Sequence, residues 1–424
     1  MVNFSETILW VLYIASLYFT IFWILVFLSS RKKFIKERNV SKLSKFPFIS
    51  IIIPAYNEEV AIESTIKSVL NLNYPKDKLE VIVVNDGSVD NTQKVVERFI
   101  KRNKNNKVKL INQENQGKAK SLNNALNVVN GEFFACLDAD SFVQRDTLKK
   151  MILTYHKYND KDLVIVTPAM KIKKPKNLVQ KLQRVEYFVM MFVARLMSSI
   201  DCIYVAPGPF SLYKTQVIRD LGGFDEHNLT EDQEIAYRVQ KNHYRIKQCY
   251  NAYVYTGAPK SIPTLYKQRN RWFKGGLFNI IKYKKIMFNK EYGDFGMMQM
   301  MMNAFYFVLS LFAVSLFGYY FIWPFLKGIR NFYLVGFDWR PYITDIINFE
   351  LKFMNINVEK VFILISVLTL SLIIFFIAHR NADESIKKHG TIYLFLYFFI
   401  YYIGLGIIEV IVLFEYLIGK RQKW

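Results

Sequence analysis

Four long apolar stretches constrain the fold of this chain more than any other feature. They are residues 8–28, 297–326, 361–378 and 391–417. The first three contain no charged residue, and the last contains only Glu409 and Glu415. Runs of about 18 or more apolar residues are long enough to span a bilayer. The sequence therefore predicts a multi-pass integral membrane protein.

Positive charge beside the first apolar stretch predicts its orientation. Arg31, Lys32 and Lys33 follow it directly, and the whole chain carries a formal net charge of +22. Lys and Arg gather on the cytoplasmic side of membrane spans, near anionic lipid headgroups. The segment after this stretch is therefore expected in the cytoplasm, at the plasma membrane. The stretch has neither a basic leader nor a small-residue cleavage site, so it is interpreted as an anchor and not a signal peptide.

The last apolar stretch leaves the topology open. Four straight spans would put the basic tail 420–423 outside the cell, against the same charge rule. Gly404 and Gly406 would let this stretch bend and return without crossing. Its length of about 27 residues is too short for two full spans.

Several classes of function are disfavoured. The sequence contains no nucleic-acid reader motif to accompany its positive charge, so a nucleic-acid partner is not expected. Its cysteines, Cys136, Cys202 and Cys249, lack the spacing of a metal or redox site and indicate a reducing compartment. No G-x-G-x-x-G sequence follows the first predicted strand, which disfavours a dinucleotide site.

Between the first two apolar stretches, short apolar runs alternate with amphipathic segments. The runs predict strands at residues 46–54, 79–84, 108–111, 133–137 and 163–166. Helical spacing follows at residues 60–70, at 90–101 and after Gly117. This alternation predicts an α/β domain with a mostly parallel sheet and right-handed crossovers.

Two carboxylates, Asp138 and Asp140, come directly after the predicted central strand 133–137. Ligands of open α/β sheets bind beyond the carboxyl ends of the strands. Mg²⁺ and Mn²⁺ bind one or two carboxylates together with substrate phosphates. The pair therefore indicates a metal-bound diphosphate, and two aspartates that cap a turn are the alternative.

Three further segments belong to the region before the second apolar stretch. Residues 180–200 combine an apolar surface with scattered charges, which suits a helix at the membrane boundary or a core helix. The sequence Thr230-Glu231-Asp232-Gln233 has the form of a capping box and predicts a helix start. Gly275-Gly276 precedes a basic amphipathic run at 277–285, another interfacial candidate.

An ordered series of motifs resembles that of the family 2 glycosyltransferases with a GT-A fold. The likeness is greatest to the processive membrane synthases of poly-N-acetylglucosamine, hyaluronan, chitin and cellulose. The motifs are Pro54-Ala55-Tyr56-Asn57-Glu58, Asn85-Asp86-Gly87-Ser88, Gly117-Lys118-Ala119, Asp138-Ala139-Asp140, Thr230-Glu231-Asp232 and Gln268-Arg269-Asn270-Arg271-Trp272. Each is weak alone, and their order makes the resemblance specific.

The resemblance implies four parts of the chain. A transmembrane anchor (1–30) and a basic linker (31–45) would precede a cytoplasmic GT-A domain with interfacial helices (46–290). An all-α transmembrane region (291–424) would follow. The implied partners are a UDP-sugar donor, a polysaccharide or glycan acceptor and membrane lipids, and an accessory subunit is compatible with this family.

The resemblance also implies how the donor is held. Asp86 would accept a hydrogen bond from the uracil base, with Tyr56 and Glu58 near the base and ribose. Lys118 would offer a point charge to phosphate. Asp138 would lie by the nucleotide-sugar, and Asp140 with Asp138 would hold Mg²⁺ or Mn²⁺.

Transfer to the acceptor is assigned by the same resemblance. Asp232 would be the general base with Glu231 beside it, although a helix N-terminus should lower the pKa of such a carboxylate. Gln268 and Arg271 would contact the diphosphate, and Arg269 would do likewise or pair with an acidic residue. Trp272 would stack on the acceptor sugar, or else belong to an interfacial aromatic belt. The turn 206–211 would lie at the acceptor, although Pro209 departs from the family pattern.

Three functions remain in competition. The first is an inverting, processive synthase that uses a UDP-sugar, with UDP-GlcNAc favoured, and moves the polymer across the membrane. The second is a non-processive transferase that adds one sugar to a lipid. The third is a non-catalytic scaffold or transporter, against which the intact set of aspartates argues.

Overall fold

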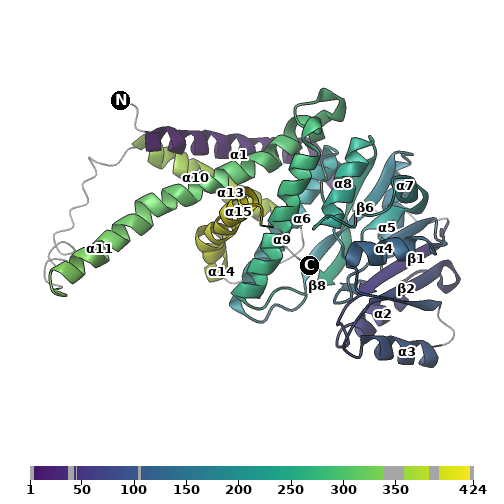
Figure 1. Ribbon diagram of the computed structural model, residues 1–424. Coiled ribbons are helices and arrows are strands. Elements are labelled where there is room, and N and C mark those ends of the chain that lie inside the picture. Colours follow the sequence, from purple (N-terminus) through teal and green to yellow (C-terminus); the bar gives the residue numbers. More distant parts are fainter. Residues whose placement is uncertain are drawn as a thin grey trace.

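The computed structural model describes residues 4–36, 43, 45–103, 107–338, 358–381 and 391–420. An α/β domain lies at one end of the molecule, and long helices extend from it at the other (Figure 1). The first apolar helix precedes the α/β domain in the chain and yet packs among the C-terminal helices. The two ends of the chain therefore build one helical region.

The α/β domain is built on one eight-stranded sheet of order β3-β2-β1-β4-β7-β6-β8-β5. Its strands are β1 (Ile49–Ala55), β2 (Leu79–Asp86), β3 (Val108–Gln113), β4 (Phe133–Cys136), β5 (Phe142–Val143), β6 (Leu163–Ile172), β7 (Leu212–Lys214) and β8 (Arg245–Thr256). β3, β2, β1 and β4 are parallel, as are β6 and β8, whereas β7 and β5 pair antiparallel with their neighbours. The predicted mostly parallel GT-A sheet is confirmed.

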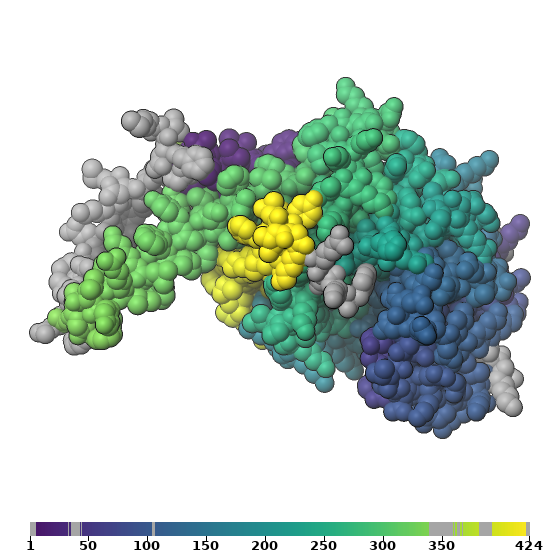
Figure 2. Space-filling model, viewed as in Figure 1, coloured from purple at the N-terminus to yellow at the C-terminus, as the bar shows by residue number. Residues whose placement is uncertain are grey.

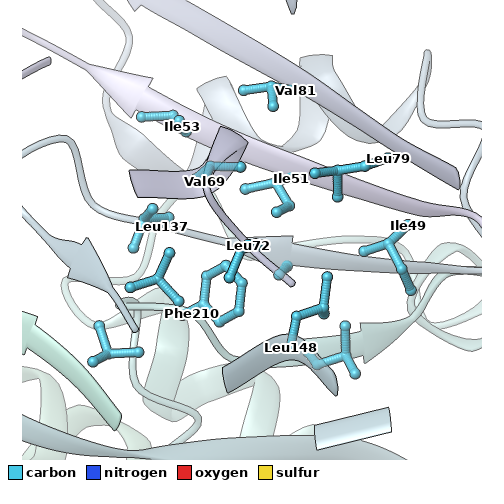
Figure 3. Close-up of a cluster of buried hydrophobic side chains, with 14 of the residues drawn as sticks. Ile49, Ile51, Ile53, Val69, Leu72, Leu79, Val81, Leu137, Leu148 and Phe210 are labelled. Atoms are coloured by element: carbon cyan, nitrogen blue, oxygen red, sulfur yellow. The ribbon is translucent and has the colours of Figure 1, made fainter. Parts of the chain in front are cut away.

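Helices cover both faces of this sheet. They are α2 (Ile62–Leu70), α3 (Thr92–Arg102), α4 (Lys118–Leu126), α5 (Thr147–Tyr158), α7 (Thr215–Asp220) and α8 (Glu231–Lys241). Side chains alternate along a strand, so Ile49, Ile51 and Ile53 of β1 meet α2, α3 and α5 on one face (Figure 3). Ile52 points to the other face, where α4, α7 and α8 pack. Burial on both faces explains why these strands are nearly continuous apolar runs.

The remaining α-helices lie outside this α/β core. They are α1 (Phe4–Lys36), α6 (Leu178–Ser199), α9 (Ile262–Lys282), α10 (Met300–Phe317), α11 (Trp323–Leu334), α13 (Val358–Asn381), α14 (Thr391–Leu396) and α15 (Tyr402–Leu417). α6 contacts α1, α13 and α14, and α9 contacts α10 and α15. α6 and α9 thus join the sheet to the apolar helices.

Three helical runs among the described residues are long and apolar enough to cross a membrane: Glu6–Lys32, Phe295–Leu334 and Ile392–Leu417. The third predicted stretch contributes the shorter apolar helix Leu368–Arg380. The second run extends away from the body as the light-green arm in Figure 2. Its apolar side chains are largely exposed, with Trp323 65% exposed, which is expected of a surface that faces lipid.

The last apolar stretch forms one helical run and does not reverse. α14 passes through a π-helical turn at Tyr397–Tyr401 into α15, so Gly404 and Gly406 lie within a helix. A Cβ at Gly406 would lie 3.3 Å from Cγ2 of Val314 on α10. Gly406 therefore serves close helix packing and not a bend in the chain.

Two segments named from the sequence differ from their patterns in local detail. Gly275 and Gly276 lie inside α9, which continues into the basic run 277–285 and ends at Lys282. Thr230 is the N-cap residue of α8, so the predicted helix start is confirmed, but its hydroxyl does not cap the helix. It contacts Asn228 Oδ1 at 3.3 Å and accepts a hydrogen bond from Asn279 of α9 at 3.2 Å. Contact with α9 therefore replaces the predicted capping box.

Candidate active site

The predicted site residues gather where the parallel strands end. β1, β2 and β4 run in the same direction, so their carboxyl ends share one edge of the sheet. Tyr56 and Glu58 follow β1, Asp86 is the last residue of β2, and Asp138 lies just beyond β4. Tyr56 is 47% exposed at this edge. Residues far apart in the sequence therefore meet because of the strand order.

Asp86 organises the turn that leads into α4. Its carboxylate accepts hydrogen bonds from Gln113 Nε2 at 2.8 Å and from the backbone N–H groups of Gln116 and Gly117, both at 2.9 Å. Gly117 has a φ of 91°, in the region that favours glycine, and directly precedes Lys118. The β2 carboxylate thus fixes the start of the helix that carries the site lysine.

Lys118 lies at the centre of an acidic cluster. Its Nζ is 2.6 Å from Asp138 Oδ1 and 3.0 Å from Glu231 Oε1. Burial alone would lower the pKa of Lys118, but Asp138, Glu231 and Asp232 raise it well above its usual value. A Cβ at Gly208 would collide with the Lys118 ammonium and lie 3.1 Å from Asp138 Oδ1, so a larger residue there would displace this ion pair. This places the turn 206–211 against the cluster.

Asp232 occupies the first turn of α8 and is partly buried. Burial, followed by the charge of Glu231, raises the pKa of Asp232 to about 6, against the opposing charges of Lys118 and Arg271. The helix N-terminus was expected to lower this pKa. Desolvation outweighs that effect, so the carboxylate has the raised basicity that suits a general base.

A second group of carboxylates surrounds Asp140. Desolvation and the charge of Asp138 raise the pKa of Asp140. Burial, Asp140 and Asp138 raise the pKa of Glu58 to about 7. A Cβ at Gly257 would lie 2.8 Å from Asp140 Oδ2, so this glycine keeps the space beside the carboxylate open. No group of three potential protein ligands for a metal occurs among the described residues.

The residues from Gln268 to Trp272 lie on α9, which packs against the start of α8. Arg271 is close enough to Asp232 to lower its pKa. Arg269 is fully buried and forms an ion pair of 2.5 Å with Glu186 of α6, and Gln268 accepts a hydrogen bond from it. The Arg269 guanidinium also lies 4.1 Å from the centroid of the Trp272 ring. Arg269 was expected either to contact the diphosphate or to pair with an acidic residue. In the structure it pairs with the acidic residue Glu186.

Sequence reasoning missed the residues that support this site. Glu186 binds Arg269 and also accepts a hydrogen bond from the Tyr401 hydroxyl at 2.7 Å. Gly208 and Gly257 leave room for the Lys118 and Asp140 side chains. A charge within an apolar helix is the only sequence signal for Glu186. Gly208 lies in the turn 206–211 that the resemblance placed at the acceptor, whereas Gly257 belongs to none of the motifs.

Known proteins resemble this chain in sequence and in fold. The family described as "Glycosyl transferase family 2" matches residues 50–222. A poly-beta-1,6-N-acetyl-D-glucosamine synthase of Staphylococcus epidermidis is 32% identical over 286 residues, which cover 64% of this chain and 67% of that protein. The chain belongs to glycosyltransferase family 2.

Two more comparisons extend this family assignment. A poly-beta-1,6-N-acetyl-D-glucosamine synthase of Staphylococcus aureus (strain COL) is 33% identical over 229 residues, 54% of each chain. This glycosyltransferase thus spans about half to two thirds of the length of these relatives. The mannosyltransferase PcManGT from Pyrobaculum calidifontis, solved with GDP-Man and Mn2+, superposes with a TM-score of 0.60 at 19% identity. That superposition covers 97% of this chain and 100% of PcManGT, and it confirms the GT-A fold.

Proposed function

We propose that this glycosyltransferase is an inverting, processive synthase that transfers N-acetylglucosamine from UDP-GlcNAc to a growing polysaccharide. The proposal rests on one observation above all. Lys118 lies between Asp138 and Glu231 at the carboxyl edge of the sheet. It also lies near Asp232, the carboxylate whose pKa is raised. The names of the staphylococcal relatives favour N-acetylglucosamine as the sugar.

The donor would lie across the ends of β1, β2 and β4. Asp86 would meet the uracil base, since carboxylate oxygens can accept more than one hydrogen bond each. Tyr56 and Glu58 would line the base and ribose. Lys118 would meet a phosphate of UDP, and it then exchanges part of its contact with Asp138 for one with the donor. Gln268 and Arg271 would donate to the same diphosphate from α9.

A divalent cation fits the group of carboxylates at this edge. Asp140, with Asp138, would hold Mg²⁺ or Mn²⁺. Burial, followed by the charge of Asp138, raises the pKa of Asp140, and a cation would offset the second of these effects. The space kept open by Gly257 suits an ion that takes most of its ligands from phosphates and water. When bound, such an ion supplies Lewis-acid stabilisation of the leaving diphosphate.

Asp232 would take the proton from the acceptor hydroxyl. The acceptor oxygen forms its bond to the anomeric carbon while the bond to the UDP oxygen breaks, and the electron pair leaves with UDP. Attack from the opposite face inverts the anomeric centre. The charge that builds on UDP is met by Lys118 and Arg271, which are held in place before reaction.

The acceptor would approach from the side of α9 and the apolar helices. Trp272 would stack on the terminal sugar with the ring face that Arg269 leaves free. α9 contacts α10 and α15, so a polymer that leaves Trp272 meets the apolar helices directly. This arrangement supports a cytoplasmic catalytic domain at 46–290 that feeds a transmembrane region.

Product size tests processivity. Full-length protein in lipid vesicles, given UDP-GlcNAc and Mn²⁺, is expected to produce a polymer of many sugars that a β-N-acetylglucosaminidase degrades. A single-sugar glycolipid as the sole product would contradict processive synthesis and favour the lipid-acceptor alternative. Retention of the polymer inside vesicles whose catalytic domain faces outward would support translocation.

A further inference from the structure

A cavity of about 650 Å³ lies beside the candidate active site and is separate from it. It is bordered by the C-terminal half of α2, by β5, by the end of β6 and by α6. Five of its lining residues are cationic: Lys67, Lys171, Lys173, Lys174 and Arg184. None of the lining residues that the structure describes is acidic. Lys67 forms an ion pair of 2.6 Å with Glu63, which lies outside the lining, and the other four cations make the lining basic. The proposed transfer reaction makes no use of this cavity.

The rest of the cavity wall is apolar and aromatic. The side chains that form it are Phe142, Met170, Ile172, Tyr187, Phe188, Met191 and Tyr255. Lys171 Nζ lies 4.1 Å from the centroid of the Tyr253 ring, and Lys173 Nζ lies 5.9 Å from that of Phe142. Lys173 and Lys174 are exposed at the rim, whereas Phe188 and Met191 are buried in the floor. A ligand that fits must pair an anionic group with an apolar part.

The floor of the cavity adjoins the apolar helices. The Phe188 ring stacks on His379 of α13 with centroids 4.3 Å apart. Farther along α6, the Arg195 guanidinium lies 4.1 Å from the Phe34 ring of α1 and donates a hydrogen bond to the Phe34 carbonyl at 3.1 Å. Phe34 and His379 lie at the ends of the apolar runs Glu6–Lys32 and Leu368–Arg380. α6 therefore lies at the level where lipid headgroups meet these helices.

We propose that this cavity binds an anionic phospholipid, with its phosphate among Lys171, Lys173 and Lys174 and an acyl chain against Phe188 and Met191. Anionic lipids are concentrated where clusters of Lys and Arg meet the cytoplasmic leaflet. The apolar floor distinguishes this ligand from a soluble phosphate, which would gain nothing from Phe188 or Met191. The site goes beyond the proposed transfer reaction and does not depend on it.

The site also adjoins the active site through two elements. Phe142 begins β5 two residues after Asp140, and Tyr187 follows Glu186, the partner of Arg269. A bound lipid would hold α6 and the Asp140 turn together. We therefore expect anionic lipid to raise the transfer rate of the reconstituted enzyme as a secondary consequence.

Native mass spectrometry of the full-length protein in detergent tests the site directly. The probes are dioctanoyl phosphatidylglycerol, dioctanoyl phosphatidylcholine and inorganic phosphate. We expect phosphatidylglycerol to be retained at least about fivefold more than phosphatidylcholine, because only the former carries net charge. A tenfold excess of inorganic phosphate should not displace it. Equal retention of the two lipids, or displacement by phosphate, would overturn the proposal, the latter in favour of a soluble anion.

Charge reversal at the rim provides the matched comparison. The double variant Lys173→Glu/Lys174→Glu should lower phosphatidylglycerol retention to the level of phosphatidylcholine. Lys94→Glu/Lys101→Glu on α3 makes the same change in charge at exposed positions that do not line the cavity, and this variant should retain the lipid. Equal loss in both double variants would contradict a specific site. If Lys173→Glu/Lys174→Glu does not fold, the single variants Lys67→Gln and Arg184→Gln give an independent measurement. Unchanged phosphatidylglycerol retention in both single variants would also overturn the proposal.

Discussion

Asp232 is the residue on which the proposed chemistry depends most. It lies on α8 beside Glu231 and within electrostatic reach of Lys118 and Arg271. The substitution Asp232→Asn keeps the shape of the side chain and removes the base. We expect kcat to fall by about 10²- to 10⁴-fold, the range of general-base contributions. Binding of UDP-GlcNAc, measured by calorimetry, should change little, and retention of full activity would remove Asp232 from the mechanism.

The raised pKa of Asp232 predicts a pH profile. A general base acts when deprotonated, so kcat/KM should be constant above the pKa and decline as the pH falls through about 6. The charge of Glu231 is the second cause of this shift, after burial. In Glu231→Gln the acidic limb should therefore move to lower pH. An acidic limb that stays in place would show that another group controls it.

The site was predictable at this scale only in part. The place of Asp138 at the end of a buried strand indicated a ligand site. Asp86, Lys118 and Asp232 were named through the resemblance to the family motifs. The contact between Lys118 and Glu231 could not be predicted, since it depends on how α4 and α8 are placed on the same face of the sheet. The ion pair between Arg269 and Glu186 could not be predicted either, because Glu186 lies on α6, which carries none of the motifs.

Among the elements, α9 joins the most parts of the site. Gly275 faces Thr230 so closely that an added Cβ would overlap its hydroxyl, whereas a Cβ at Gly276 would lie 3.6 Å from Gln233 Oε1, an ordinary contact. This contrast gives a packing reason for Gly275 and none for Gly276. Gly275 is required because α9 packs closely against Thr230 at the start of α8.

The pair of glycines gives a matched prediction. Gly275→Ala should cost about 1–3 kcal/mol of stability, as for other overpacked positions, and should lower activity because it pushes Arg271 away from Asp232. Gly276→Ala should be neutral or slightly stabilising, since Ala favours a helix over Gly. Thermal unfolding and transfer rates of both variants check this. Equal effects of the two substitutions would refute the close packing of α9 on Thr230.

The strands show which elements a sequence pattern identifies. β1, β2, β3, β4 and β6 were predicted because each contains an apolar run between turn residues. β8 was missed because its buried positions include Lys247 and Gln248. Lys247 is satisfied by the Ser198 carbonyl at 2.8 Å and by Asp201 at 2.5 Å, both near the end of α6. In the sequence, a lysine that is buried and paired in the folded protein cannot be told from a lysine on the surface.

For the whole molecule, the catalytic domain is fastened to the last apolar helix through Glu415. Glu415 of α15 accepts from Lys274 at 2.7 Å and from Asn270 at 3.0 Å, both on α9. Lys420 also binds it at 2.9 Å, from an exposed position. The helix with Arg271 and Trp272 is therefore held against the proposed polymer path by a mostly buried ion pair.

Glu415→Ala should leave Lys274 buried without its partner, at a cost of about 3–5 kcal/mol. We expect polymer synthesis to weaken more than donor binding, because most of the proposed donor contacts lie on the sheet and only Gln268 and Arg271 come from α9. Lys420→Ala removes only the exposed partner and should cost less than about 1 kcal/mol. Product yield and UDP binding, measured side by side, separate the two roles. If Glu415→Ala and Lys420→Ala behave alike, α15 does not position α9.

The central claim is that the acidic edge of the sheet activates a UDP-sugar with the help of a divalent cation. The most direct test is UDP release by purified full-length protein, given Mn²⁺ or Mg²⁺ and a panel of UDP-sugars. The account predicts rapid release with UDP-GlcNAc, little with UDP-glucose or UDP-galactose, and none with EDTA or in Asp140→Asn. Equal release in the presence of EDTA, or release from no UDP-sugar at all, would contradict it.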